Sequence, residues 1–271
     1  MAVFKNGLFA SYNGEIINPV NNIAASVAAN NFFQSAGITN QQQRYAVYNL
    51  VADLQSYSIW DKMKAIYPFV GQPEVTSSFE VNLKDPTTFR GTFYGTWSFA
   101  DTGITPDGET AYMSTGLIPS SQFNTINDGN FGYYHRTSMK SNSTVVGAAS
   151  GGNYVMDWIA NAEGSFPSIN DGNSAALNYA NNIKGFRQIS RNSLNVNQIL
   201  YKLNTTDYSV VTQAPGPRPT NQIYVGSAGT LFYSDSEIAF VYIGDTSLTT
   251  TEQSNFYTAV QRFQTTLGRQ V

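Results

Sequence analysis

The chain has no cysteine among its 271 residues, and this absence excludes several classes of function. Disulfide bonds, cysteine-based zinc sites and a thiol nucleophile are impossible, so the fold must be stabilised by packing. Histidine is almost as scarce, because His135 is the single example. A histidine-rich metal site is therefore excluded, and any Ser-His-Asp triad would have to use His135. The sequence places no nucleophile beside it, so we expect a structural or surface role for this residue.

Charged residues are also few, at 12% of the chain, which is about half the usual share, and the net charge is only -3. No basic stripe is present that could neutralise phosphate groups, which argues against nucleic-acid binding. No run of like charge and no basic amphipathic helix suggests a membrane surface. No stretch approaches about eighteen apolar residues, and residues 1–20 lack the apolar core of a signal peptide. Neither Sec export nor a membrane span is expected.

Among the features that are present, the clearest periodicity lies in residues 79–118. Between residues 89 and 99, aromatic residues and glycines alternate with polar residues, and a period of two indicates a half-buried strand. Gly91 and Gly95 would let such a strand bend or bulge, so we expect one curved inner strand. Residues 105–108 predict a tight turn, after which residues 110–115 return as a second strand. The large side chains of this ladder are expected in the core. The functional alternative is a surface for stacking sugars, formed by Phe89, Phe93 and Trp97.

Two segments have apolar residues at helical spacing. Over roughly residues 27–67 the sequence predicts a helical hairpin, with a capping box at residues 39–42 and an end at Tyr67-Pro68. Its single apolar face needs a sheet to pack on. Near the end of the chain, residues 249–252 form a second capping box. The helix that follows has a stripe of residues expected to be buried, which consists of Phe256, Val260, Phe263 and Leu267.

The region between the two helical segments predicts a β-sandwich. Many short strands, with turn signals about every ten residues, indicate an antiparallel sandwich or jelly roll. Residues 161–182, rich in Asn, Ser, Gly and Ala, are expected to be a long excursion with weak structure. We therefore predict a mainly β protein with four parts: an arm over residues 1–25, a helical hairpin over 26–72, a two-sheet antiparallel jelly-roll sandwich over 73–248, and a C-terminal helix over 249–271 packed on the sandwich.

The predicted arm carries Asn-Gly and Asn-Pro pairs, which favour turns over regular structure. Two interpretations are open for it. Chain termini of this kind are often disordered. In the functional interpretation, the arm docks onto a neighbouring subunit through its apolar anchors, which are Val3, Phe4, Leu8 and Phe9.

Three blocks of the sequence are similar to one known family. They are YPFVG followed by VNLKDPTTFRGTFYGTWSF, ILYKLNTTD followed by QIYVGSAG, and EIAFVYIGD followed by TTEQSNFYTAVQRFQTTLGRQV. Together they cover roughly residues 32–271 and resemble the concanavalin A-like, laminin-G-like domains of bacteriophage virion proteins, mainly tail or head fibres and related surface proteins. The resemblance implies a lectin-like sandwich. At residues 201–205 the family tends to place an Asn-Gly hairpin turn, and the absence of glycine here predicts a longer or differently shaped turn.

The resemblance also implies a location and a set of partners. The protein would lie on the surface of a virion, would be made in the host cytoplasm without a signal peptide, and would attach to other virion proteins through the arm. Fibre-type virion proteins are commonly trimers, so a homo-oligomer, with a trimer favoured, is expected. Neither nucleic acid nor a membrane is expected as a partner.

Three functions fit these features. The first is a fibre or receptor-binding component whose sandwich binds a host-surface glycan or receptor. The alternative is a capsid decoration, neck or fibre-joining subunit that binds only virion proteins. The third is a capsule depolymerase, which would need two carboxylates flanking a glycosidic bond. The acidic pair Asp235 and Glu237 lies in a Ser-rich context typical of a solvated edge, so we expect no enzymatic activity.

Glycan recognition would use exposed aromatic side chains with amide and carboxylate partners. Tyr154, Asp157 and Trp158 lie together in the sequence. The chain also has 17 tyrosines, more than a core needs, because each buried hydroxyl requires a partner. The further candidates for a binding surface are Tyr112, Tyr133 and Tyr134.

No cofactor is expected, although fold analogy leaves calcium open. Calcium needs several oxygen ligands, which Asp and Asn in a loop often supply. Weak candidates surround the predicted tight turn, namely Asp101, Asp107 and Glu109. Turn chemistry alone also accounts for acidic residues at such positions.

Overall fold

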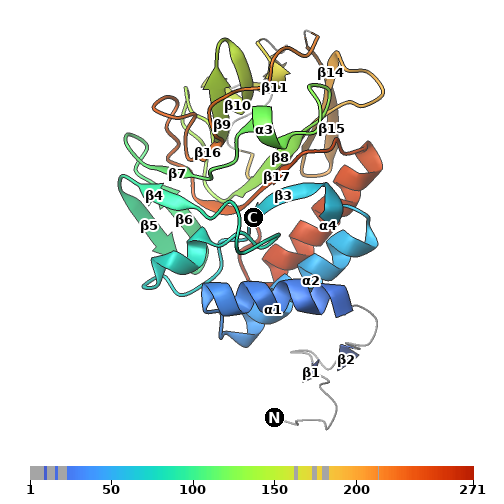
Figure 1. Cartoon of the computed structure of the whole chain (residues 1–271). Coiled ribbons are helices and arrows are strands. Elements are labelled where there is room, and N and C mark those ends of the chain that lie inside the picture. The colour runs from blue at the N-terminus through green and yellow to red at the C-terminus, as the bar shows by residue number, and fades with distance from the viewer. Residues whose placement is uncertain are drawn as a thin grey trace.

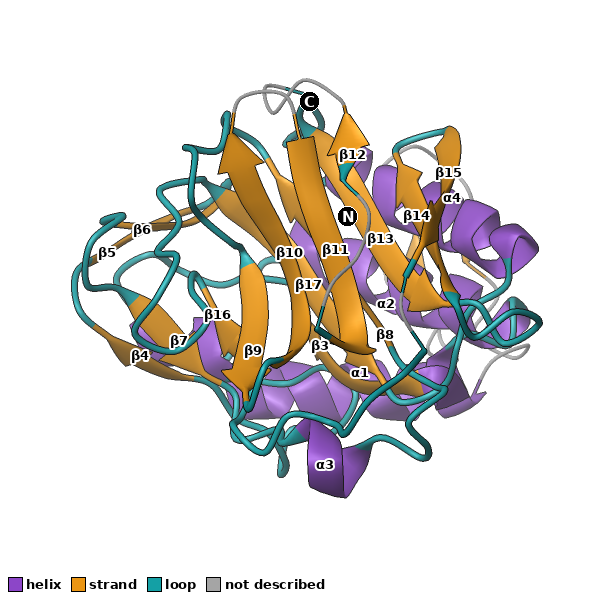
Figure 2. Ribbon diagram, turned by 90° about the horizontal axis from the view of Figure 1, so that it is seen from above, coloured by secondary structure: helices purple, strands orange, loops and turns teal. Residues whose placement is uncertain are grey.

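Two antiparallel sheets packed face to face form the centre of the molecule (Figure 2). The computed structural model describes residues 9–10, 16–17, 23–161, 164–172, 176–178, 183–212 and 214–271. The first sheet has seven strands in the order β12 (Leu177–Asn178), β11 (Gly164–Asp171), β10 (Asn153–Asn161), β9 (Val146–Ser150), β16 (Tyr224–Val225), β7 (Tyr112–Ser114) and β4 (Thr92–Tyr94). The predicted two-sheet antiparallel sandwich is confirmed.

The second sheet has eight strands and is organised around β17 (Ile238–Gly244). Its path runs through β15 (Thr206–Val211), β14 (Gln198–Leu203), β13 (Gly185–Arg191), β8 (Asn130–His135), β17, β6 (Gly103–Pro106) and β5 (Trp97–Ala100). The eighth strand, β3 (Met63–Tyr67), also pairs with β17. A separate two-residue pairing joins β1 (Phe9–Ala10) to β2 (Ile16–Ile17).

Three long helices form a layer beneath the eight-stranded sheet (Figure 1). They are α1 (Ile23–Ala36), α2 (Gln41–Ser56) and α4 (Thr250–Thr266). The shorter helices are two 3-10 helices, η2 (Trp60–Lys62) and η3 (Thr76–Glu80), and the four-residue α-helix α3 (Pro119–Gln122). None of the helices in the described ranges is both long and apolar enough to cross a membrane.

The eight-stranded sheet therefore has a hydrophobic core on each side. Every residue of β8, β13 and β17 is buried, so alternation along these strands distributes side chains between two cores. On β8, Tyr133 lies between the sheets and Tyr134 lies under the helices. In the helical core, the rings of Tyr242 and Phe256 have centroids 4.5 Å apart. The C-terminal helix is thus packed on the sandwich as expected.

The capping residues explain where two of the helices begin. At α4, Thr249 accepts from the Glu252 backbone N–H while the Glu252 carboxylate accepts from the Thr249 backbone N–H, so the predicted capping box is confirmed. At α2 the cap is Asn40, whose Oδ1 accepts from the Gln43 backbone N–H at 3.1 Å. The box predicted to begin at Thr39 was therefore placed one residue early.

The predicted single strand over residues 89–99 is two strands in different sheets. The chain turns at Gly95, whose φ of +74° favours glycine, so β4 belongs to the seven-stranded sheet and β5 to the other. Phe93, Trp97 and Phe99 nevertheless pack against the core between the sheets. The prediction that these rings belong to the core is confirmed, while the single curved strand is wrong.

Three other local predictions are corrected. Residues 63–67 form β3 instead of continuing the helical hairpin, because they pair with β17 and fill both cores. Part of the supposed excursion over residues 161–182 is β11, which pairs with β10 along most of its length. The turn between β14 and β15 has only two residues, because Asn204 adopts a φ of +52° in place of glycine.

Candidate functional site

Two of the proposed binding residues, Tyr133 and Asp157, are buried between the sheets, where no ligand at the surface can contact them. The Asp157 carboxylate accepts a hydrogen bond from the Tyr133 hydroxyl at 2.8 Å and from the Tyr201 hydroxyl at 3.1 Å. The Arg187 guanidinium lies 3.7 Å from the same carboxylate oxygen. These side chains join β10 of one sheet to β8, β13 and β14 of the other, so they stabilise the sandwich.

His135 belongs to this buried network. Its Nε2 accepts from Arg187 Nε at 3.2 Å, while Nδ1 lies 2.9 Å from the Thr137 carbonyl oxygen. Burial, and then the neighbouring Arg187 charge, lower the pKa of His135 to about 3. The imidazole is neutral at physiological pH. Of the two roles expected for it, structural or surface, this buried position fits the structural one.

Tyr134 is also unavailable to a surface ligand, because it lies under the helical layer and the C-terminal tail. Its hydroxyl accepts from the Val271 backbone N–H at 2.9 Å and donates to the Val271 carbonyl at 3.3 Å. Burial raises the pKa of this hydroxyl. Tyr134 therefore fixes the end of the chain.

Of the acidic residues singled out around the tight turn, which are Asp101, Asp107 and Glu109, it is Asp107 that has structural partners. The Asp107 carboxylate accepts backbone N–H bonds from Glu109, Thr110 and Ala111 and a hydroxyl bond from Thr110, which together keep its pKa well below the usual range. This is the chemistry of a turn. No group of three or more His, Asp or Glu side chains that could hold a metal ion occurs in the described ranges.

The pair Asp235 and Glu237 is equally accounted for. Asp235 accepts from the Lys140 backbone N–H at 3.2 Å. Both Glu237 oxygens lie within 2.9 Å of Arg136 Nη1. Of the predicted docking anchors, Val3, Phe4 and Leu8 lie outside the described residues, and for Phe9 only the backbone of β1 is described.

The remaining candidates lie on the outer face of the seven-stranded sheet, which no described helix covers (Figure 2). Phe93, Met113 and Val225 of β4, β7 and β16 point inward, so the residues between them point outward. Outward-pointing tyrosines on these three strands form a row, which we call the tyrosine row and which consists of Tyr94, Tyr112 and Tyr224. The Tyr94 and Tyr112 rings stack at 4.9 Å and 21°, and Tyr224 meets Tyr112 edge-on at 5.5 Å.

The polar groups around the tyrosine row are available for a ligand. Tyr94 is 48% exposed. Among the described residues, none of the three tyrosine hydroxyls of the row has a hydrogen-bond partner. Beside the row, Gln222 Oε1 accepts from Ser114 Oγ and from the Gly116 backbone N–H, both at 2.8 Å, which orients the Gln222 amide. Rings, hydroxyls and an oriented amide are the groups that recognise polar ligands with an apolar surface.

The structure thus brings Tyr112 together with two tyrosines that the sequence did not single out. Tyr94 falls on the polar side of the 89–99 ladder, and that alternation was the available signal for its exposure. Tyr224 lies in the two-residue strand β16, which gives no periodicity to interpret. Its neighbour across the sheet, Ser114, is distant in sequence.

Tyr154 and Trp158 occupy the same outer face on β10. Their burial is intermediate, whereas Val155 and Ile159 point into the core. Trp158 is packed between Phe166 and Phe232, with centroids 5.3 and 5.5 Å away, and its Nε1 donates to Asn142 Oδ1. Its ring faces are therefore largely occupied. Tyr154 has no ring contact or side-chain hydrogen bond with any described residue, so it remains available.

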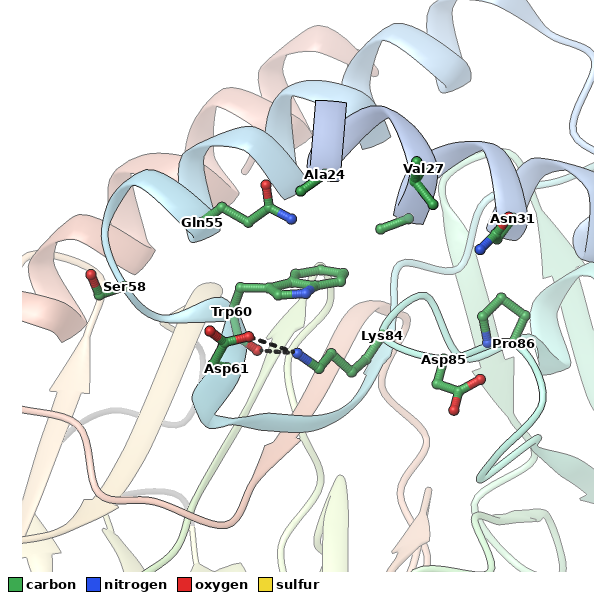
Figure 3. A pocket seen from close by; sticks show the side chains of 11 residues that line it. Ala24, Val27, Asn31, Gln55, Ser58, Trp60, Asp61, Lys84, Asp85 and Pro86 are labelled. Atoms are coloured by element: carbon green, nitrogen blue, oxygen red, sulfur yellow. Dashed lines mark hydrogen bonds and ion pairs between the residues drawn. The ribbon is translucent and has the colours of Figure 1, made fainter. Parts of the chain in front are cut away.

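A groove of about 880 Å³ lies on the helical side of the molecule (Figure 3). Trp60 is only 8% exposed, and Lys84 Nζ lies 4.6 Å from the centroid of its ring. Lys84 donates to the Trp60 carbonyl at 2.8 Å, and burial lowers its pKa. The charged and aromatic groups here bind one another, which makes this groove a weaker ligand site than the tyrosine row. Its lining comes from α1, the end of α2, η2 and the loop at residues 84–86, and comprises Ala24, Val27, Ala28, Asn31, Gln55, Ser58, Trp60, Asp61, Lys84, Asp85 and Pro86.

The fold is a two-sheet antiparallel sandwich with helices packed on one of its sheets, and several solved structures have a similar fold. Domain 4 of the extracellular arabinanase AbnA from Geobacillus stearothermophilus, in complex with arabinotriose, aligns with a TM-score of 0.51 and 11% identity, covering 72% of this chain and 98% of that one. The binding domain of botulinum neurotoxin DC, in complex with rat synaptotagmin II, aligns with a TM-score of 0.51 and 11% identity, covering 75% of this chain and 52% of that one. The binding domain of botulinum neurotoxin serotype D aligns with a TM-score of 0.52 and 9% identity, with the same coverage of both chains.

These similarities establish the fold alone, because the identities are so low. The chain spans about half the length of the toxin binding domains that it matches. Its sequence matches no protein-family model and no curated protein.

Proposed function

We propose that this protein is a non-enzymatic bacteriophage virion protein, a fibre or receptor-binding component, whose sandwich binds a host-surface glycan or receptor through the open face of the seven-stranded sheet. The observation that carries this proposal is the tyrosine row. Three neighbouring rings without hydroxyl partners in the described structure lie on the sheet face that the helices leave uncovered. Such aromatic residues are typical of binding surfaces, because one end is apolar and the other is polar.

The structural similarities support a binding function of either kind. The arabinanase domain was solved with arabinotriose and the neurotoxin domain with the protein synaptotagmin II. A non-enzymatic function is supported by Asp107, Asp235 and Glu237, whose carboxylates are engaged in turns or in an ion pair.

The arrangement of the layers supports attachment from the opposite side. The first helix of the helical layer, α1, lies on the side of the molecule away from the seven-stranded sheet (Figure 1). In this proposal the arm leads from there to other virion proteins and the protein assembles as a trimer on the particle. The open sheet face then points toward the host.

The test is a glycan array and a host-cell binding assay on the full chain and on Tyr112→Ala. The matched control is Tyr45→Ala, which removes a partly exposed tyrosine on α2, on the other side of the molecule. We expect wild type and Tyr45→Ala to bind and Tyr112→Ala to lose at least about tenfold in affinity, as for a residue central to an interface. Equal binding by all three would place the ligand elsewhere. Absence of binding to any glycan or host cell would favour the decoration or fibre-joining subunit instead.

A further inference from the structure

We propose that the open face binds an extended chain of uncharged sugars, laid across the strands from the tyrosine row to Tyr154. This inference rests on the proposed function and specifies its ligand class. It excludes a single terminal acidic sugar as the principal ligand. Three features carry it: the alignment of the aromatic residues, the small residues between them, and the charge of the face.

The aromatic residues follow a diagonal across neighbouring strands, because Tyr224 is opposite Gly147 of β9 whereas Tyr154 is opposite Ala149, two residues further along β9. Tyr94 is directly opposite Tyr112, and Tyr224 is opposite Ser114 on the next strand. On the far side, Tyr154 is opposite Ala149 of β9. Adjacent strands lie about 4.8 Å apart, so the four steps from β4 through β7, β16 and β9 to β10 span about 19 Å. That length accommodates several consecutive sugar residues, and a single sugar would contact only part of it.

On β9, the strand between Tyr224 and Tyr154, the outward residues are small. β9 presents Gly147 and Ala149 outward, since Val146 and Ala148 point into the core. The segment containing Ala228 lies over Gly147, because a Cβ at Gly147 would be 2.7 Å from the Ala228 Cβ. A ligand that extends from the tyrosine row to Tyr154 therefore crosses β9 at Ala149, where it contacts no large side chain of that strand.

The face offers no cation to an acidic sugar. The outward positions of these five strands are uncharged in the described structure; they are Thr92, Tyr94, Tyr112, Ser114, Tyr224, Gly147, Ala149, Tyr154, Met156 and Trp158. The carboxylate of Asp107, in the turn before β7, stays ionised because its pKa is lowered. Lys140 donates to the Gly108 carbonyl and Arg90 pairs with Glu80. A sugar carboxylate laid on these five strands would therefore have no charged partner among their described outward residues.

Calorimetric titration with a series of neutral oligosaccharides, from disaccharide to hexasaccharide, tests this directly. We expect affinity to rise with length and then level off. Tyr154→Ala should lower the affinity for the longest oligosaccharide about fivefold and leave disaccharide binding unchanged, whereas Tyr112→Ala should weaken both. Tyr154→Phe keeps the ring and should retain most of the affinity. Sialylated and uronate-containing oligosaccharides of equal length should bind more weakly than the neutral ones.

Two results would overturn the inference while the proposed function survives. One is a disaccharide, or an acidic glycan, that binds as tightly as the neutral hexasaccharide with no effect of Tyr154→Ala. The other is binding of the chain to a host protein receptor and to no glycan. A chain that binds neither glycans nor host cells would instead overturn the proposed function, and this inference with it. Circular dichroism of each variant identifies losses that come from misfolding.

Discussion

At the scale of single residues, Arg269 has the most demanding environment. It is fully buried, and its guanidinium donates to the carbonyl oxygens of Pro68, Phe69 and Ala239 and to Gln264 Oε1. Burial, followed by the nearby Arg136 charge, lowers the pKa of Arg269 to about 9, which still leaves it charged at neutral pH. One side chain therefore supplies hydrogen bonds to the carbonyl oxygens that follow β3, to the start of β17 and to a side chain in the last turn of α4.

Replacing Arg269 should consequently destabilise the whole fold. We expect Arg269→Met to lower the free energy of unfolding by about 3 kcal/mol or more, because it leaves buried carbonyl oxygens without a donor. Urea denaturation measures this. The matched control is Arg262→Met on the same helix, whose ion pair with Asp53 is half-exposed and should cost less than about 1 kcal/mol. Similar losses for the two variants would contradict the role given to Arg269.

His135 predicts a pH dependence of stability. Its folded-state pKa of about 3 lies below the ordinary value of 6.5, so between these values the unfolded chain binds a proton that the folded chain does not. Its contribution to stability is therefore complete above pH 6.5 and is lost as the pH falls, by about 1.4 kcal/mol per unit.

The measurement is urea denaturation at pH 6.5 and pH 4.5 for wild type and His135→Gln. Wild type should lose about 2.5 kcal/mol more than the variant between the two pH values. Comparing the two chains removes the contribution of carboxylates such as Asp171, whose pKa burial raises. Identical pH dependence would show that His135 is protonated without cost in the folded state.

The buried residues Tyr133, Tyr134 and Asp157 show why the sequence could not identify the site completely. Alternation along β8 correctly separates Tyr133 from Tyr134, but it does not say that both sides of the strand are buried. Aromatic and acidic residues near one another, such as Asp157 and Trp158, are equally consistent with a surface site. Asp157 is buried only because Tyr133, Tyr201 and Arg187 of the opposite sheet supply its partners, and these partners are distant in sequence.

At the scale of elements, Gly95 decides where β4 ends and β5 begins. The period of two continues across this turn because Phe93 and Trp97 both point into the same core from different sheets. Periodicity therefore predicted the buried face and could not predict the change of sheet. Where a local signal specifies the structure by itself, as at the capping box of Thr249, the sequence prediction of the element is correct.

Substitution of Gly95 should be far more damaging than substitution of a glycine with similar backbone geometry. Gly95 and Gly116 have φ values of +74° and +70°, but a Cβ at Gly95 would lie 2.7 Å from the backbone of Thr110 and Ala111, whereas nothing lies within 4 Å at Gly116. We expect Gly116→Ala to cost about 1 kcal/mol and Gly95→Ala at least about 2 kcal/mol more. Thermal denaturation measures the difference, and equal melting temperatures for the two variants would contradict this prediction.

At the scale of the whole molecule, the layers give the protein two different sides. The helical layer covers one sheet and leaves the outer face of the other without a described helix, so in the proposed function binding and attachment use different sides. Fold class and the two terminal helical regions could be predicted from turn spacing and caps. The sequence could not predict which of the two sheets the helices cover. That is determined by contacts between residues distant in sequence, such as the ring contact between Phe186 and Phe256.

This arrangement predicts the effect of removing residues 1–22. The buried hydrophobic residues of both described cores begin at Ala25, so the truncated chain should keep its Tm within about 2 °C and its glycan affinity unchanged. In the proposed virion role it should nevertheless change from trimer to monomer in light scattering and fail to enter particles. A truncated chain that remains trimeric would place the subunit interface on the sandwich or the helical layer. A large fall in Tm would show instead that the arm completes a core, so that folding and assembly could not be separated in this molecule.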